Sequence, residues 1–154
     1  MTSVWIVHQY LFMKLLKYLF IISYAVLFVY AVFFARRRRH MVQQYLYIYP
    51  LRKTVSEFRA LHYTNTRDVV NFYSNLAGNF ILFIPYTFIV MILFNYKNRW
   101  LVLLSVFLLS LSVEIAQYVF RVGVADMDDL ILNTAGGCAG ILVCIWVQKR
   151  WTST

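Results

Sequence analysis

Four long runs of apolar residues constrain how this chain can fold more than any other feature. They cover residues 18–35, 76–94, 101–120 and 130–147, and each is close to the ~20 residues that a helix needs to cross a bilayer. Lipid offers no hydrogen bonds to an exposed backbone, so only helices and closed barrels span membranes. The runs lack the alternation of barrel strands. The sequence therefore predicts an all-α, polytopic integral membrane protein with a bundle of four transmembrane helices.

The composition agrees with lipid as the main solvent of the surface. Of the 154 residues, 62% are hydrophobic and only 14% are charged, against about 25% charged in a typical soluble domain. The first run is too long for the core of a typical signal peptide, and no small-residue cleavage site precedes the arginines that follow it. We expect it to remain as an uncleaved anchor, and residues 1–154 to form a single membrane domain.

The segments between the runs predict the topology. Residues 36–74 form a long first loop, in which "LRKTVSEFRALHY" after Pro50 is expected to form a short interfacial helix. The loops at 95–99 and 121–129 are short, so the second, third and fourth helices should pack as a contiguous antiparallel bundle. With four spans, both termini should lie on the same side of the membrane.

Basic residues are divided unevenly between the two sides of this topology. The side of the termini holds six: Lys14, Lys17, Lys97, Arg99, Lys149 and Arg150. The other side holds nine: Arg36, Arg37, Arg38, Arg39, Arg52, Lys53, Arg59, Arg67 and Arg121. This excess favours a cytoplasmic first loop. We interpret the run Arg36–Arg39 as a stop-transfer flank that touches lipid headgroups, because nothing else in the chain indicates nucleic acid.

Polar residues inside the predicted spans gather at one end of the bundle. Spacings of three and four residues place them in one stripe on each of three helices. Connectivity puts all three stripes in the same half of the membrane, with Glu114 and Asn133 roughly 9–10 Å inside their spans at 1.5 Å per residue. The sequence therefore predicts one polar binding pocket, formed by Asn75, Asn79, Glu114, Gln117, Arg121, Asp126, Asp129 and Asn133.

These residues also have structural interpretations. Asp126 followed by Asp129 is typical of a helix N-cap with an acid in the first turn, and Asp128 is expected to be solvated. Asn79 and Gln117 would hydrogen-bond between helices. Glu114 is harder to explain in this way, because an ionisable residue in a span is costly and usually faces a bundle interior with a partner. Its candidate partners are Asn79, Asn133 and Arg121.

Small residues follow on the same face of the last predicted helix. They are Gly136, Gly137 and Gly140. A G-x-x-x-G spacing allows a neighbouring helix to approach closely and requires no ligand. We therefore interpret the three glycines as helix-packing positions.

Two segments of the chain together resemble the VanZ-like family. They are "NLAGNFILFIPYTF" (residues 75–88) and "VEIAQYVFRVGVADMDDLILNTAGGCAGILV" (residues 113–143). The family combines an N-x-x-x-N helix bearing Phe-x-Pro, a Glu-x-x-Gln helix, and a short Asp-x-x-Asp loop that leads into a glycine-containing helix. The matching residues here are Asn75, Asn79, Pro85, Glu114, Gln117, Asp126, Asp129, Asn133, Thr134, Gly136 and Gly140. The family often carries an "NLIPF"-like segment in the first loop, and "YIYPLRK" stands near that place here.

The resemblance implies a multi-pass bacterial membrane protein. The family is named for a member that confers low-level resistance to glycopeptide antibiotics, teicoplanin in particular. Our first hypothesis is a non-enzymatic protein of the cell envelope in Gram-positive bacteria that lowers susceptibility to teicoplanin or lipoglycopeptides. It would bind the antibiotic or a lipid-linked cell-wall precursor in the acidic, asparagine-rich pocket. Direct capture of an antibiotic requires this pocket to face outside, against the charge distribution.

Two further hypotheses stay open. An intramembrane enzyme acting on a lipid headgroup would use Glu114, Asp126 and Asp129 as acid and base, or to hold one Mg²⁺ or Mn²⁺. The sequence offers no activated nucleophile, so covalent catalysis is not expected. A small transporter or accessory subunit would need to form an oligomer, and polar residues confined to one leaflet argue against a continuous pathway.

Overall fold

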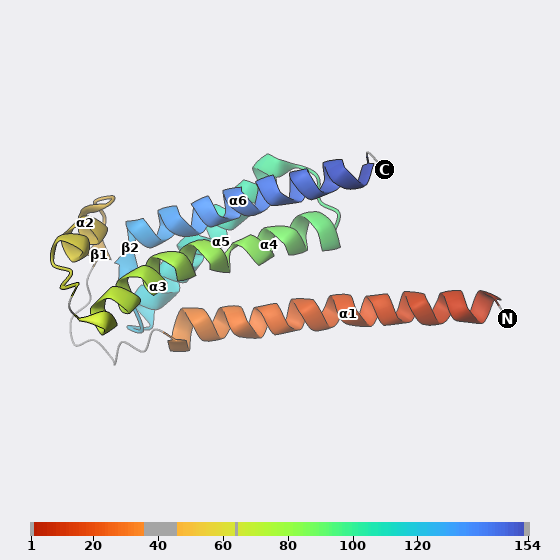
Figure 1. Cartoon of the computed structure of the whole chain (residues 1–154), viewed down its shortest axis with the longest axis horizontal. Coiled ribbons are helices and arrows are strands. Elements are labelled where there is room, and N and C mark those ends of the chain that lie inside the picture. Colours follow the sequence, from red (N-terminus) through yellow and green to blue (C-terminus); the bar gives the residue numbers. More distant parts are fainter. Residues whose placement is uncertain (1, 36–45, 64, 153–154) are drawn as a thin grey trace.

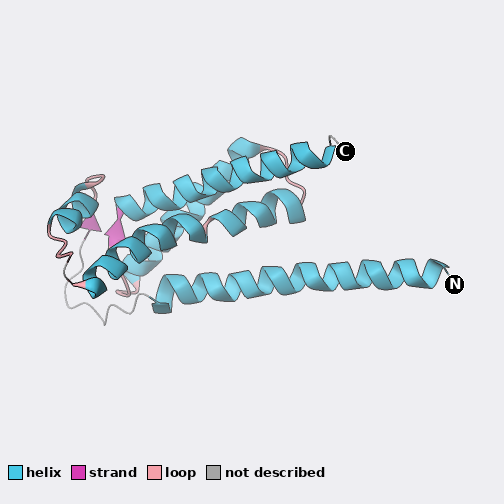
Figure 2. Cartoon of the chain, in the orientation of Figure 1, coloured by secondary structure: helices cyan, strands magenta, loops and turns pink. Residues whose placement is uncertain are grey.

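Helices make up most of the computed structural model, which describes residues 2–35, 46–63 and 65–152 (Figure 1). In chain order the elements are α1 (Thr2–Tyr30), the π-helix η1 (Ala31–Ala35), β1 (Leu46–Tyr47), α2 (Arg52–Arg59), α3 (Thr66–Leu82), α4 (Ile84–Phe88), the π-helix η2 (Ile89–Leu93), α5 (Arg99–Val119), β2 (Ala125–Asp126) and α6 (Met127–Thr152). Figure 2 shows how little of the chain is strand. The predicted all-α class is confirmed.

Four helical segments are long and apolar enough to cross a membrane. They are Val7–Phe34, Thr66–Leu93, Arg99–Val119 and Met127–Arg150. Each contains or overlaps one of the four predicted runs, so the chain is a polytopic membrane protein. The start of α1 and the end of α6 lie at one end of the bundle, and α2, β1 and β2 lie at the other (Figure 1).

The first two helices begin earlier than the hydropathy pattern indicated. Lys14 and Lys17, which that pattern placed before the first helix, lie within α1. Lysine is a good helix former, so it interrupts an apolar run without ending the helix. The last part of the predicted first loop is also helical, because Asn65 caps α3 by accepting a hydrogen bond from the Arg67 N–H at 3.1 Å. The run Arg36–Arg39 falls outside the described residues.

The second span is not one continuous α-helix. It breaks at Phe83, between α3 and α4, and Pro85 stands in the first turn of α4. Proline has no N–H to donate and its ring clashes with the preceding turn, so a helix tends to end before it. The short helix predicted after Pro50 is present as α2.

Helix α6 contacts α3, α4 and α5. This agrees with the contiguous packing that the short loops predicted. Its glycines lie where the helices come closest: a Cβ at Gly136 would be 1.9 Å from the carbonyl oxygen of Phe80, and one at Gly137 would be 2.5 Å from Cγ1 of Val106. Gly136 therefore faces the backbone of α3, and Gly137 faces the side chain of Val106 in α5.

Helix α1 packs less closely than the other three spans. Most of its large apolar side chains are exposed in the isolated chain. It joins the bundle through one face, where the rings of Phe28 and Phe83 meet edge to face at a centroid distance of 5.5 Å. Nearby, the Tyr24 hydroxyl donates a hydrogen bond to the Leu82 carbonyl at 3.0 Å. The rest of its described apolar surface is exposed.

Candidate functional site

A short parallel strand pair brings the first loop onto the turn between α5 and α6. Leu46 pairs with Ala125, and Tyr47 pairs with Asp126. These two segments are far apart in the sequence, and no pattern in either of them predicted the pairing. As a result, α2 lies beside the first turn of α6 (Figure 1).

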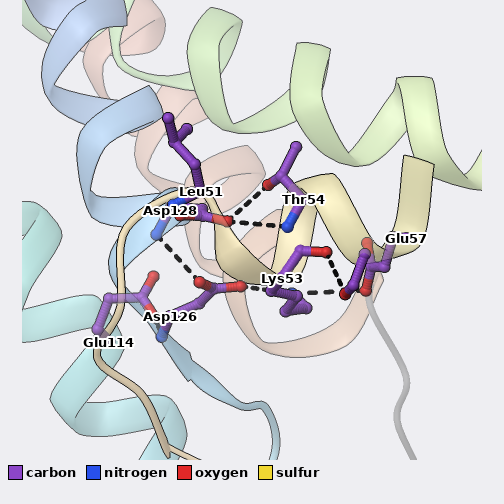
Figure 3. Close-up of polar contacts among 8 residues, drawn as sticks. Leu51, Lys53, Thr54, Glu57, Glu114, Asp126 and Asp128 are labelled. Carbon is purple, nitrogen blue, oxygen red and sulfur yellow. Dashed lines mark hydrogen bonds and ion pairs between the residues drawn. The ribbon is translucent and has the colours of Figure 1, made fainter. Parts of the chain in front are cut away.

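Lys53 of α2 forms a buried ion pair with Asp126 (Figure 3). The two side chains are only 9% and 2% exposed, and a charge that deeply buried is tolerated only when it is paired. The other carboxylate oxygen of Asp126 accepts a hydrogen bond from the Asp128 N–H at 3.0 Å. Asp126 therefore caps α6, as predicted, and also binds α2.

Asp128 caps the N-terminus of the neighbouring helix α2, which has no side-chain cap of its own. Its carboxylate accepts hydrogen bonds from the Leu51 N–H, the Thr54 N–H at 3.0 Å and the Thr54 hydroxyl at 2.7 Å (Figure 3). Leu51, the N-cap of α2, supplies no side-chain cap of its own. Asp128 is only 3% exposed, so the expectation that it is solvated is wrong. Docking of the first loop covers it.

We predict that Asp128→Ala loosens α2 and leaves the rest of the bundle in place. Loss of a helix cap costs ~1 kcal/mol, which corresponds to roughly fivefold faster amide exchange. Hydrogen–deuterium exchange of residues 52–59 measures this effect. Asp68→Ala, a change of an exposed acid in the first turn of α3, is the control and should leave exchange in α2 unchanged. Equal exchange in α2 of wild type and Asp128→Ala would contradict the prediction.

Glu114 connects this cluster to the bundle interior. Its Oε2 accepts a hydrogen bond from the Asp126 N–H at 2.9 Å, and the residue is 6% exposed. Asp126 was not among the partners expected for Glu114. Lys53, Asp126 and Glu114 form a chain of contacts that runs from α2 into α5.

The polar stripes of α3, α5 and α6 meet at a cavity of about 600 Å³. Five of the residues predicted to form a pocket line it: Asn75, Asn79, Glu114, Gln117 and Asn133. Asn71 and Ser74 extend the polar lining along α3, and Ala31 and Val32 at the end of the first helix form part of its wall. The convergence expected from connectivity is therefore present in the structure.

Two side-chain hydrogen bonds join the walls of this cavity. The Gln117 side-chain amide donates to the Val32 carbonyl at 2.9 Å, which attaches the π-helix η1 to α5. The Asn133 amide donates to the Ser110 hydroxyl at 2.9 Å. Gln117 thus connects helices, as its structural interpretation predicted, and Asn133 does so as well. Both also line the cavity.

The other three predicted pocket residues lie elsewhere. Asp126 and Asp129 are buried at the start of α6, 3% and 6% exposed, and neither lines the cavity. Arg121 is exposed. It follows the end of α5 at Val119 with a left-handed φ of 56°. Because the helix has already ended, Arg121 leaves the stripe that its spacing indicated.

Sequence reasoning missed Lys53 and Thr54. Both belong to the segment after Pro50, which was interpreted only as an interfacial helix. The signal that could have identified them is the position of "YIYPLRK", near the place where the VanZ-like family often carries its first-loop segment. A lysine near that place in an apolar protein is a candidate partner for a buried acid.

Together these features define a class of protein: a polytopic membrane protein whose helices enclose a polar cavity, with the first loop bound to the cavity region through a buried ion pair. The family model of VanZ/LLP1 matches residues 15–148. The chain belongs to this family, so the resemblance noted in the motifs is confirmed.

A curated relative agrees with this assignment. Over 83 residues the chain is 34% identical to Protein VanZ of Enterococcus faecium. The aligned stretch covers 54% of this chain and 51% of that protein, so the chain spans about half the length of the relative it matches. No solved structure matches.

Proposed function

We propose that this protein lowers the susceptibility of a bacterial cell to teicoplanin or a related lipoglycopeptide antibiotic. It would do so by binding the antibiotic, or a lipid-linked cell-wall precursor, in the polar cavity. Membership of the VanZ/LLP1 family and similarity to Protein VanZ support the general role. The observation that carries the binding step is the cavity, whose 600 Å³ lies within the ~300–1,000 Å³ of small-molecule sites.

In this proposal the protein crosses the bacterial cell membrane four times, with both termini on the same side. The position of the start of α1 and the end of α6 at one end of the bundle supports that topology (Figure 1). The cavity lies toward the opposite end, near α2. An antibiotic arriving from outside reaches it directly only if that end faces outside. A cavity facing the cytoplasm would leave a lipid-linked precursor as the ligand.

Antibiotic susceptibility tests the proposed function. We expect expression of the wild type in a sensitive Gram-positive host to raise the minimal inhibitory concentration of teicoplanin. Glu114→Ala should lower it to the value of the empty vector, because it removes the buried carboxylate from the cavity. Glu57→Gln, which alters a carboxylate on α2 outside the cavity lining, is the control, and immunoblots compare expression levels. An unchanged inhibitory concentration with wild type would refute the role in resistance.

The two candidate ligands are distinguished by the side of the membrane on which the turn between α5 and α6 lies. Reporters inserted at residues 121–123 in the intact chain measure it. An external reporter signal supports direct capture of the antibiotic. A cytoplasmic signal would refute direct capture and support the precursor.

A second candidate is an enzyme that modifies a lipid headgroup. The observation in its favour is that Glu114 is buried and lines the cavity, where it could donate or accept a proton. Of the other two acids in this hypothesis, Asp126 is paired with Lys53 and Asp129 does not line the cavity. The described residues include no group of three His, Cys, Asp or Glu side chains placed to hold a metal ion. Mass spectrometry of lipids incubated with the purified protein tests this alternative. Antibiotic protection that survives Glu114→Gln would refute it.

A further inference from the structure

A narrow groove of about 280 Å³ lies between α5, the start of α6 and the first loop. Most of the side chains that line it are apolar and come from all three segments: Leu46, Ile48, Leu111, Ile115, Met127 and Leu130. Leu46, Ile48 and Ile115 are each more than half exposed in the isolated chain. The groove is therefore apolar and open to the surroundings of the protein.

The groove runs from the end of a membrane span into the region of the lipid chains. Tyr118, at one end of it, stands one residue before the last residue of the span Arg99–Val119. Leu111, at the other end, lies seven residues deeper along α5, or about 10 Å at 1.5 Å per residue. Half of the hydrocarbon core of a bilayer measures ~15 Å, so the groove extends through much of one leaflet.

Two carboxylates also line the groove, and both are bound within the protein. Glu114 accepts a hydrogen bond from the Asp126 N–H at 2.9 Å, and Asp126 forms the ion pair with Lys53. An acyl chain in the groove would therefore meet apolar side chains and carboxylates that already have partners. Burying its methylene groups there is favourable for the same reason as in any apolar site.

A second hollow, of about 390 Å³, adjoins the groove across the first loop. Residues 46–48 line both of them, so the two spaces meet at β1. The second hollow has a basic lining, formed by Arg52 and Lys53. Lys53 is already paired with Asp126. Arg52 is thus the cation of this hollow that could bind a ligand.

Arg52 is exposed and is held in place by an aromatic ring. Its guanidinium carbon lies 5.5 Å from the centre of the Tyr49 ring, a cation–π contact that keeps the positive charge. Among the described residues, no carboxylate forms an ion pair with Arg52, because the acids of this region pair with Lys53. A guanidinium binds phosphate through two parallel N–H donors. The hollow therefore complements a phosphate group.

We infer that the groove and the hollow together bind one phospholipid of the surrounding bilayer. One acyl chain lies in the groove along α5, and the phosphate binds Arg52. The two spaces meet at only three residues, 46–48, which fits a lipid whose phosphate is a few bonds away from its acyl chains. This site goes beyond the proposed function, since Arg52, Leu111 and Ile115 do not line the polar cavity.

Photolabelling of the full chain in dodecyl maltoside micelles tests the site, because this detergent carries no phosphate. The probe is phosphatidic acid with a diazirine in one acyl chain, and mass spectrometry locates the labelled residues. We expect labels to concentrate on residues 46–48 and 111–118. Unlabelled phosphatidic acid should compete at a concentration about tenfold lower than diacylglycerol with identical chains, which corresponds to ~1.4 kcal/mol. Labels spread evenly over the four spans, or equal competition by the two lipids, would overturn the inference.

Arg52→Gln tests the phosphate contact. It should abolish the tenfold preference, so that phosphatidic acid and diacylglycerol compete equally. Arg59→Gln is the matched control, because it removes an exposed arginine of α2 that lines neither the groove nor the adjoining hollow, and it should retain the preference. Loss of the preference in both variants, or in neither, would overturn the inference.

Ile115→Trp tests the groove. The larger side chain should fill it and lower the labelling of residues 46–48 about tenfold. Leu108→Trp is the control: it lies two turns away on the same face of α5, is similarly exposed (51% against 55%) and is outside the groove. It should leave the labelling unchanged, and both variants should unfold at the wild-type concentration of sodium dodecyl sulfate.

Two results with these variants would also overturn the inference. One is unchanged labelling of residues 46–48 in Ile115→Trp. The other is a wild-type dimer that Ile115→Trp dissociates, which would show that a second copy of the chain covers the groove.

Discussion

Gly136→Ala is expected to force α6 away from α3 and to be among the most damaging small substitutions in the bundle. The added Cβ would lie 1.9 Å from the carbonyl oxygen of Phe80 and 2.8 Å from its carbonyl carbon. These are backbone atoms, which cannot rotate aside, so the helices must separate. Overpacking a core typically costs 1–3 kcal/mol, and more in rigid surroundings. We expect a loss of at least ~3 kcal/mol in the free energy of unfolding, measured by titration with sodium dodecyl sulfate in mixed micelles.

A comparison within α6 provides the control. A Cβ at Gly140 would lie 1.9 Å from the Thr87 hydroxyl oxygen, which belongs to a side chain and can be removed. Thr87→Ala should therefore recover part of the stability lost in Gly140→Ala, whereas it should not rescue Gly136→Ala. Ala135→Leu, at an exposed position of α6, should change stability by less than ~0.5 kcal/mol. Rescue of both glycine variants, or of neither, would contradict this account of the packing.

Lys53→Met is expected to destabilise the protein by ~3–5 kcal/mol, the usual cost of removing one partner from a buried ion pair. It would leave the Asp126 carboxylate, 2% exposed, without its cation. Because the Asp126 N–H binds Glu114 at 2.9 Å, the disturbance should also reach the cavity. The free energy of unfolding in mixed micelles measures the first effect, and loss of antibiotic protection measures the second.

The double variant Lys53→Met/Asp126→Asn shows whether the charge is the cause. It removes both charges and keeps a side-chain oxygen to cap α6, so it should be more stable than Lys53→Met alone. The two single effects should therefore exceed the double effect by ~2 kcal/mol. Glu57→Gln is the control, because this carboxylate lies 3.9 Å from the ammonium and is 42% exposed, where an ion pair contributes little. Strictly additive effects of Lys53→Met and Asp126→Asn would contradict the prediction.

The four membrane spans could be predicted from the sequence. In lipid, the backbone N–H and C=O groups of an apolar run must hydrogen-bond within the run, so each run of nearly the right length predicts one helical span. Hydropathy does not indicate where a helix begins or ends outside its apolar run. It could not predict that Lys14 lies inside α1, or that α3 begins at the Asn65 cap instead of at the first apolar residue.

The candidate site was also predicted only in part. Helical periodicity and connectivity placed Asn79, Glu114 and Asn133 at one end of the bundle, and the cavity is there. The same periodicity misplaced Arg121, because α5 ends at Val119. It also assigned Asp128 to solvent, because a local pattern contains no information about a segment that arrives from 70 or more residues away.

The sequence by itself determined the number of spans, the membership of a family and the end of the bundle at which polar groups meet. These depend on hydrophobicity, on spacing along single helices and on motifs, all of which are local. Only the tertiary structure decided which carboxylates line the cavity. Docking of α2 pairs Lys53 with Asp126 and places Asp128 on the α2 N-terminus. Glu114 accepts a hydrogen bond from the Asp126 N–H and lines the cavity. The physical reason is that a buried carboxylate needs a partner, so its role depends on which group the fold places beside it. Here that group, Lys53, comes from a distant part of the chain.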